Sequence, residues 1–178
     1  MNRKTYLLHP RGEHRSARRD GFTLMELLIV MAIIAILSLM ALASVSMYTR
    51  RANGLSAVNS LQKIVQAQMM YSETYPANGF ACKLDSLGGN ATAGPPSPTN
   101  AQLIPPDLAT GFKQGYTFTL TCTDKVTANN VDRYNGYTVT AAPQTVGRTG
   151  DRGYCTDESG QIKYDPSGGT VCTQNLGQ

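Results

Sequence analysis

The sequence predicts an α+β protein in which one long N-terminal helix packs on an antiparallel sheet of about four strands. Three patterns support this prediction. No charged residue occurs from 27 to 48, apolar residues recur every three or four positions from 55 to 72, and four later segments alternate and are rich in Thr, Tyr and Val. The first two patterns describe one continuous helix, and the third describes the sheet.

Residues 1–21 form a basic leader whose charge differs from that of the remaining chain. The leader has six basic and two acidic residues, which account for the whole net charge of +4. The ten basic and ten acidic residues that follow cancel, so no basic field is predicted to recruit nucleic acid. Both histidines, His9 and His14, lie in the leader, and its removal leaves no imidazole for catalysis.

Residues 22–49 are predicted to form a transmembrane and assembly helix. As a helix, residues 27–48 extend about 33 Å, close to the roughly 30 Å hydrocarbon thickness of a bilayer. The leader outweighs Arg50 and Arg51, which predicts a single pass with the N-terminus in the cytoplasm and the remainder exported. Two simpler alternatives are a permanent anchor and a secretory signal peptide cut after Ala43, which would release a periplasmic protein.

Glu26 is the one acid near the start of this apolar stretch. A carboxylate costs up to roughly 3 kcal/mol deep in the membrane, less near an interface, and is usually kept because it has a specific partner. Neither simpler alternative supplies that partner. The acid therefore requires a separate explanation.

The stretch GFTLMELLIVMAIIAIL, which begins at Gly21, resembles the N-terminus of type IV prepilins and of type II secretion pseudopilins. The resemblance implies a pilin-like fold, cleavage between Gly21 and Phe22 by a prepilin peptidase, methylation of the new Phe22 amine, and a role for Glu26 in assembly. Cleavage would place an ammonium group one helical turn before Glu26, and a neighbouring subunit could supply the same group. The implied partners are identical or related pilin subunits, the prepilin peptidase and an inner-membrane assembly platform.

The chain departs from the family pattern in two ways. Its leader is longer than that of many pilins, and Ala43 stands about where many members have a helix-bending proline. Asn53 and Gly54 are then the weakest points of the predicted helix, since glycine costs about 1 kcal/mol in a helix interior.

Residues 50–74 are predicted to form the amphipathic half of the same helix. The expected buried face comprises Leu55, Val58, Leu61, Val65, Met69 and Ser72. The helix should end near Ser72 or Glu73, because the Tyr75–Pro76 pair that follows disfavours helical geometry.

Residues 75–178 are predicted to form a globular head. Residues 88–111 are rich in Gly, Pro, Ser and Thr, which indicates a surface connection. The four predicted strands are 116–123, 134–142, 152–157 and 161–165, and the last two form a hairpin.

Four cysteines lie in this head, too far apart for a CxxC motif, and their even number in an exported segment predicts disulfides. Sequence proximity favours Cys155 with Cys172 and Cys82 with Cys122, while the other two pairings remain open.

No cofactor is predicted with any strength. Oxygen ligands around the last hairpin make a weak calcium site, although their spacing matches no defined calcium loop: Asp151, Asp157, Glu158 and Asp165. Metalloprotease, phosphate-loop, nucleophile-elbow and dinucleotide motifs are absent from the sequence, so no enzyme activity is predicted.

The sequence therefore favours a structural subunit of a type IV pilus-like filament. It would be an inner-membrane precursor that becomes part of a periplasmic or extracellular fibre. A type II secretion pseudopilin is the first alternative, and a soluble periplasmic protein that begins at Ser44 is the second.

Overall fold

The structure is a computed structural model that describes residues 21–89, 92, 94–128 and 131–176. The chain divides into two compact units, Met1–Met40 and Ala41–Gln178, which are treated separately below. The predicted leader lies outside the described residues except for Gly21.

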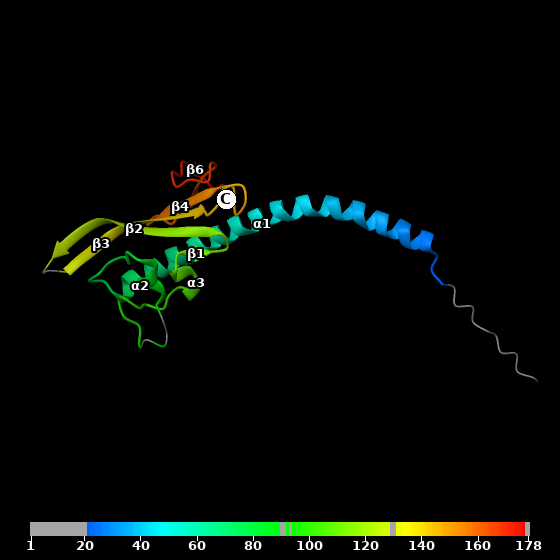
Figure 1. Cartoon of the computed structure of the whole chain (residues 1–178). Helices are drawn as coiled ribbons and strands as arrows, with labels where there is room; N and C mark the ends of the chain where they lie inside the picture. The colour runs from blue at the N-terminus through cyan, green and yellow to red at the C-terminus, as the bar shows by residue number, and fades with distance from the viewer. Residues whose placement is uncertain (1–20, 90–91, 93, 129–130, 177–178) are drawn as a thin grey trace, which may run out of the picture. The chain divides into compact units, whose positions relative to one another are not determined.

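Helix α1 spans Leu24–Thr74 and contributes to both units. It ends directly before the Tyr75–Pro76 pair, as the sequence predicts. Within the second unit, the C-terminal half of α1 runs alongside the strands and the two short helices α2 (Leu84–Gly88) and α3 (Pro106–Ala109) (Figure 1).

The sheet is an antiparallel meander of six strands in sequence order. The α+β prediction is confirmed, and the prediction of four strands is wrong. The strands are β1 (Phe112–Lys113), β2 (Tyr116–Ala128), β3 (Val131–Pro143), β4 (Gly153–Asp157), β5 (Lys163–Asp165) and β6 (Gln174–Asn175). The two additional strands have two residues each, which is too short for any alternation to be visible in the sequence.

Strands β2 and β3 are longer than predicted, because their hairpin continues past residue 123. Charged residues interrupt the apolar alternation there, and Asp124 adopts a positive φ of 51° between the Thr123–Gly136 and Lys125–Tyr134 pairs, which keep the same register. Lys125 pairs with Asp132 across the strands at 2.9 Å, and the Thr127 hydroxyl donates to the same carboxylate at 2.7 Å. This end of the hairpin is held by polar cross-strand contacts and not by core packing.

The buried face of α1 differs from the predicted one. Leu61 and Val65 are buried as expected, but Leu55 is 68% exposed and Met69 is 49% exposed. The helix instead buries the following residues against the head: Ala57, Ser60, Leu61, Ile64, Val65, Ala67, Gln68 and Tyr71. Small side chains on this face allow a close approach to the sheet.

Gln68 is fully buried on α1, and its amide makes a two-way bond with the backbone of Ala81. Its side-chain nitrogen donates to the Ala81 carbonyl at 2.8 Å, and its oxygen accepts from the Ala81 N–H at 2.9 Å. The bonds satisfy a polar group in the core and fix the chain that follows the helix.

Residues 88–111 are more than the predicted surface connection. Ala101, Ile104 and Leu108 are buried in the core, and Leu108 belongs to α3. Pro106 stands in the first turn of this short helix, where its missing N–H costs nothing. Proline content excluded sheet from this segment but did not exclude burial.

Two buried tyrosines differ in whether the hydroxyl group has a hydrogen-bond partner, so they test what that bond contributes to stability. The Tyr137 hydroxyl has no hydrogen-bond partner among the described residues, whereas the Tyr116 hydroxyl donates to the Arg152 carbonyl at 3.0 Å. We expect Tyr137→Phe to stabilise the head by about 1 kcal/mol and Tyr116→Phe to destabilise it by a similar amount. Urea unfolding of the full-length chain in neutral detergent, followed by circular dichroism, measures both changes. Equal effects of the two substitutions would contradict this assignment.

The same tyrosines predict a loss of stability in alkali. Burial, followed by the nearby Glu158 and Asp157 charges, raises the pKa of Tyr137 from 10.0 to about 12. Burial also raises the pKa values of Tyr116 and Tyr154. The unfolded chain loses these protons first as pH rises above 10, so stability present below pH 10 should fall between pH 10 and 12. Urea midpoints at successive pH values test this, and Tyr137→Phe should reduce the slope by up to about 1.4 kcal/mol per pH unit.

Candidate assembly site

The start of α1 is closed by a reciprocal pair of contacts between Thr23 and Glu26. The Glu26 N–H donates to the Thr23 hydroxyl oxygen at 3.2 Å. In return, the Thr23 N–H and hydroxyl donate to Oε2 of Glu26 at 3.0 and 3.1 Å. This is a capping box, which satisfies N–H groups that have no partner within the helix.

The capping box supplies a partner for Glu26 within its own chain. Glu26 was expected to lack a partner in an uncleaved anchor, and the contacts with Thr23 show that it has one. The signal was present in the sequence as Thr23-Leu24-Met25-Glu26, because the T-x-x-E spacing is the one that a capping box requires. Glu26 therefore has a structural role at the helix start before any role between subunits is considered.

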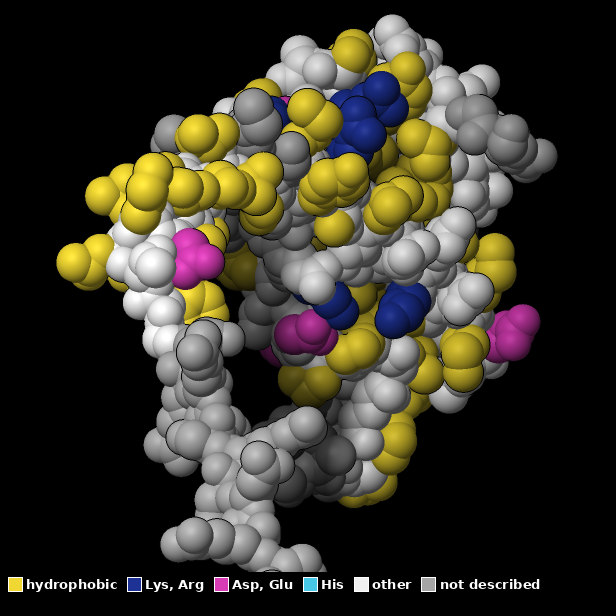
Figure 2. All heavy atoms as spheres, turned by 90° about the vertical axis from the view of Figure 1, so that its right-hand side faces the viewer, with side chains coloured by type: hydrophobic (Ala, Val, Ile, Leu, Met, Phe, Trp, Pro, Cys, Tyr) yellow, Lys and Arg dark blue, Asp and Glu magenta, His cyan; other side chains and the backbone are white. Residues whose placement is uncertain are grey.

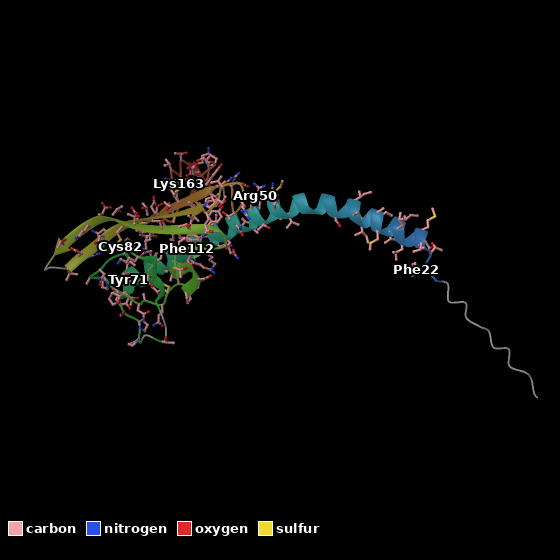
Figure 3. All side chains as sticks on the ribbon, in the orientation of Figure 1. Phe22, Arg50, Tyr71, Cys82, Phe112 and Lys163 are labelled. Atoms are coloured by element: carbon pink, nitrogen blue, oxygen red, sulfur yellow. A yellow bond between two sulfur atoms is a disulfide. The ribbon has the colours of Figure 1, made fainter. Side chains whose placement is uncertain are left out.

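The predicted cleavage position lies just before the helix. Gly21 and Phe22 precede α1, and the Phe22 side chain is 89% exposed (Figure 3). A protease must accommodate its substrate backbone in the active site, which an exposed segment outside a helix permits. The bond between Gly21 and Phe22 meets this requirement in the structure.

Exposed apolar side chains, a class coloured yellow in Figure 2, cover the first unit from position 24 to position 37. Leu24 is 89% exposed and Leu28 is 70% exposed. The exposed apolar positions are 24, 25, 27–31, 33, 34, 36 and 37. Exposed apolar surface on this scale marks a contact with other chains or with lipid. Within the described part of the chain, no helical stretch combines the length and the hydropathy of a membrane span, and the single pass predicted for 22–49 stays a prediction.

Two disulfides hold the head together. Cys82 is joined to Cys122 across 40 residues, and Cys155 is joined to Cys172 across 17 residues. These are the pairs that sequence proximity favours. The first ties the segment after α1 to β2, and the second ties β4 to the segment before β6, with Cys82 visible in Figure 3.

Three of the four calcium candidates bind other groups of the chain, and among the described residues the four do not form a common site. Asp151 accepts from Arg50 at 2.8 Å, Asp157 accepts from Ser159, and Asp165 accepts from the Ser167 hydroxyl and N–H at 2.6 and 2.8 Å. The Ser167 bonds lower the pKa of Asp165. Glu158 is exposed, and no group of three or more potential ligands was found among the described residues.

Comparison with known proteins identifies the N-terminal region. Residues 16–42 match the family described as the prokaryotic N-terminal methylation motif. No curated protein and no solved structure matches the chain. The match covers the candidate cleavage position, the capping box and the exposed apolar surface at positions 24–37.

Proposed function

We propose that this chain, which carries the N-terminal methylation motif that is the signature of type IV pilins and pseudopilins, is a structural subunit of a type IV pilus-like filament. The motif supports processing by a prepilin peptidase and assembly into filaments. The single observation that carries the proposal is the motif at residues 16–42, which contains Glu26. The two disulfides favour a pilus over a secretion pseudopilus, because a surface fibre must resist shear and proteolysis.

The geometry at Glu26 supports a double role for its carboxylate. Both contacts with Thr23 use Oε2, and no described contact uses Oε1. Oε1 can therefore accept an ammonium group while the capping box stays closed. In the proposed filament this ammonium is the Phe22 amine, and the pairing selects the register of helices whose apolar contacts change little between lipid and fibre.

The precursor is proposed to be membrane-anchored before assembly, as the motif implies. Its single pass and cytoplasmic N-terminus rest on the sequence, because 27–48 lacks charge and the leader carries the excess of basic residues. Assembly then exchanges lipid contacts of the exposed apolar side chains for contacts with neighbouring helices.

Mass spectrometry of the mature N-terminus tests the proposed processing. Methylated Phe22 is the expected terminus. Ser44 would indicate a soluble secreted protein, and an intact Met1 would indicate a permanent anchor. A matched pair, Gly21→Leu and Ala52→Leu, places leucine at the cleavage position or at an exposed site outside the motif, and only the first should leave the precursor uncut.

Electron microscopy and a secretion assay separate the pilus from the pseudopilus. Deleting the gene should remove or shorten surface filaments while the export of other proteins continues. Loss of export with normal surface filaments would assign the chain to a secretion pseudopilus and would contradict the pilus proposal.

A further inference from the structure

A basic cavity opens on the second unit, outside the assembly site. Its volume is about 520 Å³, and it lies where α1 passes the beginning of β4. The cavity is lined by Arg50, Arg51, Gly54, Leu55, Tyr116, Asp151, Arg152 and Tyr154. Gly54 helps to keep it open, because a Cβ there would stand 2.9 Å from the Tyr154 hydroxyl.

The charges in this cavity are unbalanced. Three arginines face one aspartate, and Asp151 is already paired with Arg50 at 2.8 Å. Among the described residues, neither Arg51 nor Arg152 has a carboxylate at ion-pair distance. Two guanidinium groups therefore remain to bind an anion from outside the chain, and their planar N–H groups suit the oxygens of a phosphate.

Both of these arginines are presented to solvent. Arg51 is exposed on α1. Arg152 is also exposed, and its guanidinium lies 4.7 Å from the centre of the Tyr164 ring. The Tyr116 hydroxyl donates to the Arg152 carbonyl and holds the backbone of this residue in place. A stacked and anchored arginine loses less conformational entropy when it binds.

Apolar side chains flank Arg51 along the helix. Tyr48, Arg51 and Leu55 are three and four residues apart, so they lie on one helix face. Tyr48 is 72% exposed and Leu55 is 68% exposed. A cation between exposed apolar groups can bind a molecule that has an anionic headgroup and an apolar tail. Tyrosine and arginine side chains are also typical of membrane interfaces.

We infer that this cavity binds the phosphate of an anionic phospholipid headgroup through Arg51 and Arg152. The lipid as the source of the phosphate rests on the proposed membrane-anchored precursor. The binding would orient the head of a subunit before assembly, because only Thr49 and Arg50 separate Arg51 from the uncharged stretch 27–48.

Binding can be measured on the full-length precursor in neutral detergent micelles that contain phosphatidylglycerol or phosphatidylcholine. Phosphorus NMR of the headgroup and the thermal midpoint of the protein both report binding. We expect phosphatidylglycerol to bind, and Arg51→Gln and Arg152→Gln each to weaken it about tenfold. Arg148→Gln is the matched control, since Arg148 is exposed, carries the same charge and does not line the cavity.

The outcomes are distinct. Equal weakening by Arg148→Gln would show a general surface charge effect and overturn the site. Equal affinity for inorganic phosphate, with the same dependence on Arg51, would overturn the lipid as the ligand. Arg51→Gln retains the Arg152 stack, so it tests the site even if Arg152→Gln unfolds. The assay needs neither cleavage nor filaments, so its failure is separate from a failure of the proposed function.

Discussion

Replacing Glu26 with glutamine is expected to abolish filaments while the helix start remains intact. Glutamine can serve at this position of a capping box, so the contacts with Thr23 should persist. The substitution removes the negative charge that would pair with a neighbouring Phe22 ammonium group. Loss of one member of a buried ion pair costs about 3 to 5 kcal/mol, which corresponds to a reduction in assembly of at least about 100-fold. Quantitative electron microscopy and sedimentation of sheared filaments measure the loss.

Thr23→Ala is the matched control for the Glu26 experiment. It keeps the carboxylate but removes the hydroxyl that accepts from the Glu26 N–H at 3.2 Å. We expect a cost of about 1 kcal/mol at the helix start, with filaments still formed. Glu26→Ala, which removes both functions, should also block assembly without reducing the membrane-associated precursor. Normal filaments from Glu26→Gln, or an equal loss from Thr23→Ala, would assign Glu26 to helix capping alone.

Loss of the disulfides is expected to have the largest effect on the stability of the head. In the chain-entropy description, the Cys82–Cys122 loop of 40 residues contributes about 4 kcal/mol and the Cys155–Cys172 loop of 17 residues about 3 kcal/mol. Domains of this size have only about 5 to 15 kcal/mol in total. Removing both bonds should therefore leave the head marginal or unfolded.

Paired alanine substitutions separate the two disulfides. Urea unfolding of the full-length chain should show a greater loss for Cys82→Ala with Cys122→Ala than for Cys155→Ala with Cys172→Ala. Replacing both members of a pair leaves no unpaired thiol to exchange. Peptide mapping without reductant verifies that the remaining bond is native. A greater loss from the shorter loop would show that local packing, and not loop length, determines the contribution.

Local signals in the sequence predicted much of the N-terminal region. The T-x-x-E spacing of Thr23 and Glu26 is the sequence pattern of a capping box. The capping box was nevertheless not among the sequence predictions. The Tyr75–Pro76 pair marks the end of α1, and the Gly21–Phe22 junction marks the candidate cleavage position. Each signal involves residues within one helical turn of each other, so their chemistry is visible without a fold.

Features that depend on distant contacts were harder to predict. Leu55 belongs to the same apolar periodicity as Leu61, yet only Leu61 is buried, because the position of the sheet selects the buried face. The short strands β1 and β6 exist because neighbouring strands offer backbone hydrogen bonds, which leave no pattern in two residues. Their side chains carried no signal of their own.

The sequence by itself determined the long helix with its start and end, the candidate cleavage position and the presence of paired cysteines. All of these arise from spacing along one chain segment. Only the tertiary structure decided which face of α1 is buried, how many strands form the sheet, and that Arg50 meets Asp151 beside Arg51 and Arg152. The reason is physical: these features depend on contacts between separate chain segments, as Arg50 and Asp151 are 101 positions apart, and folding alone brings such segments together.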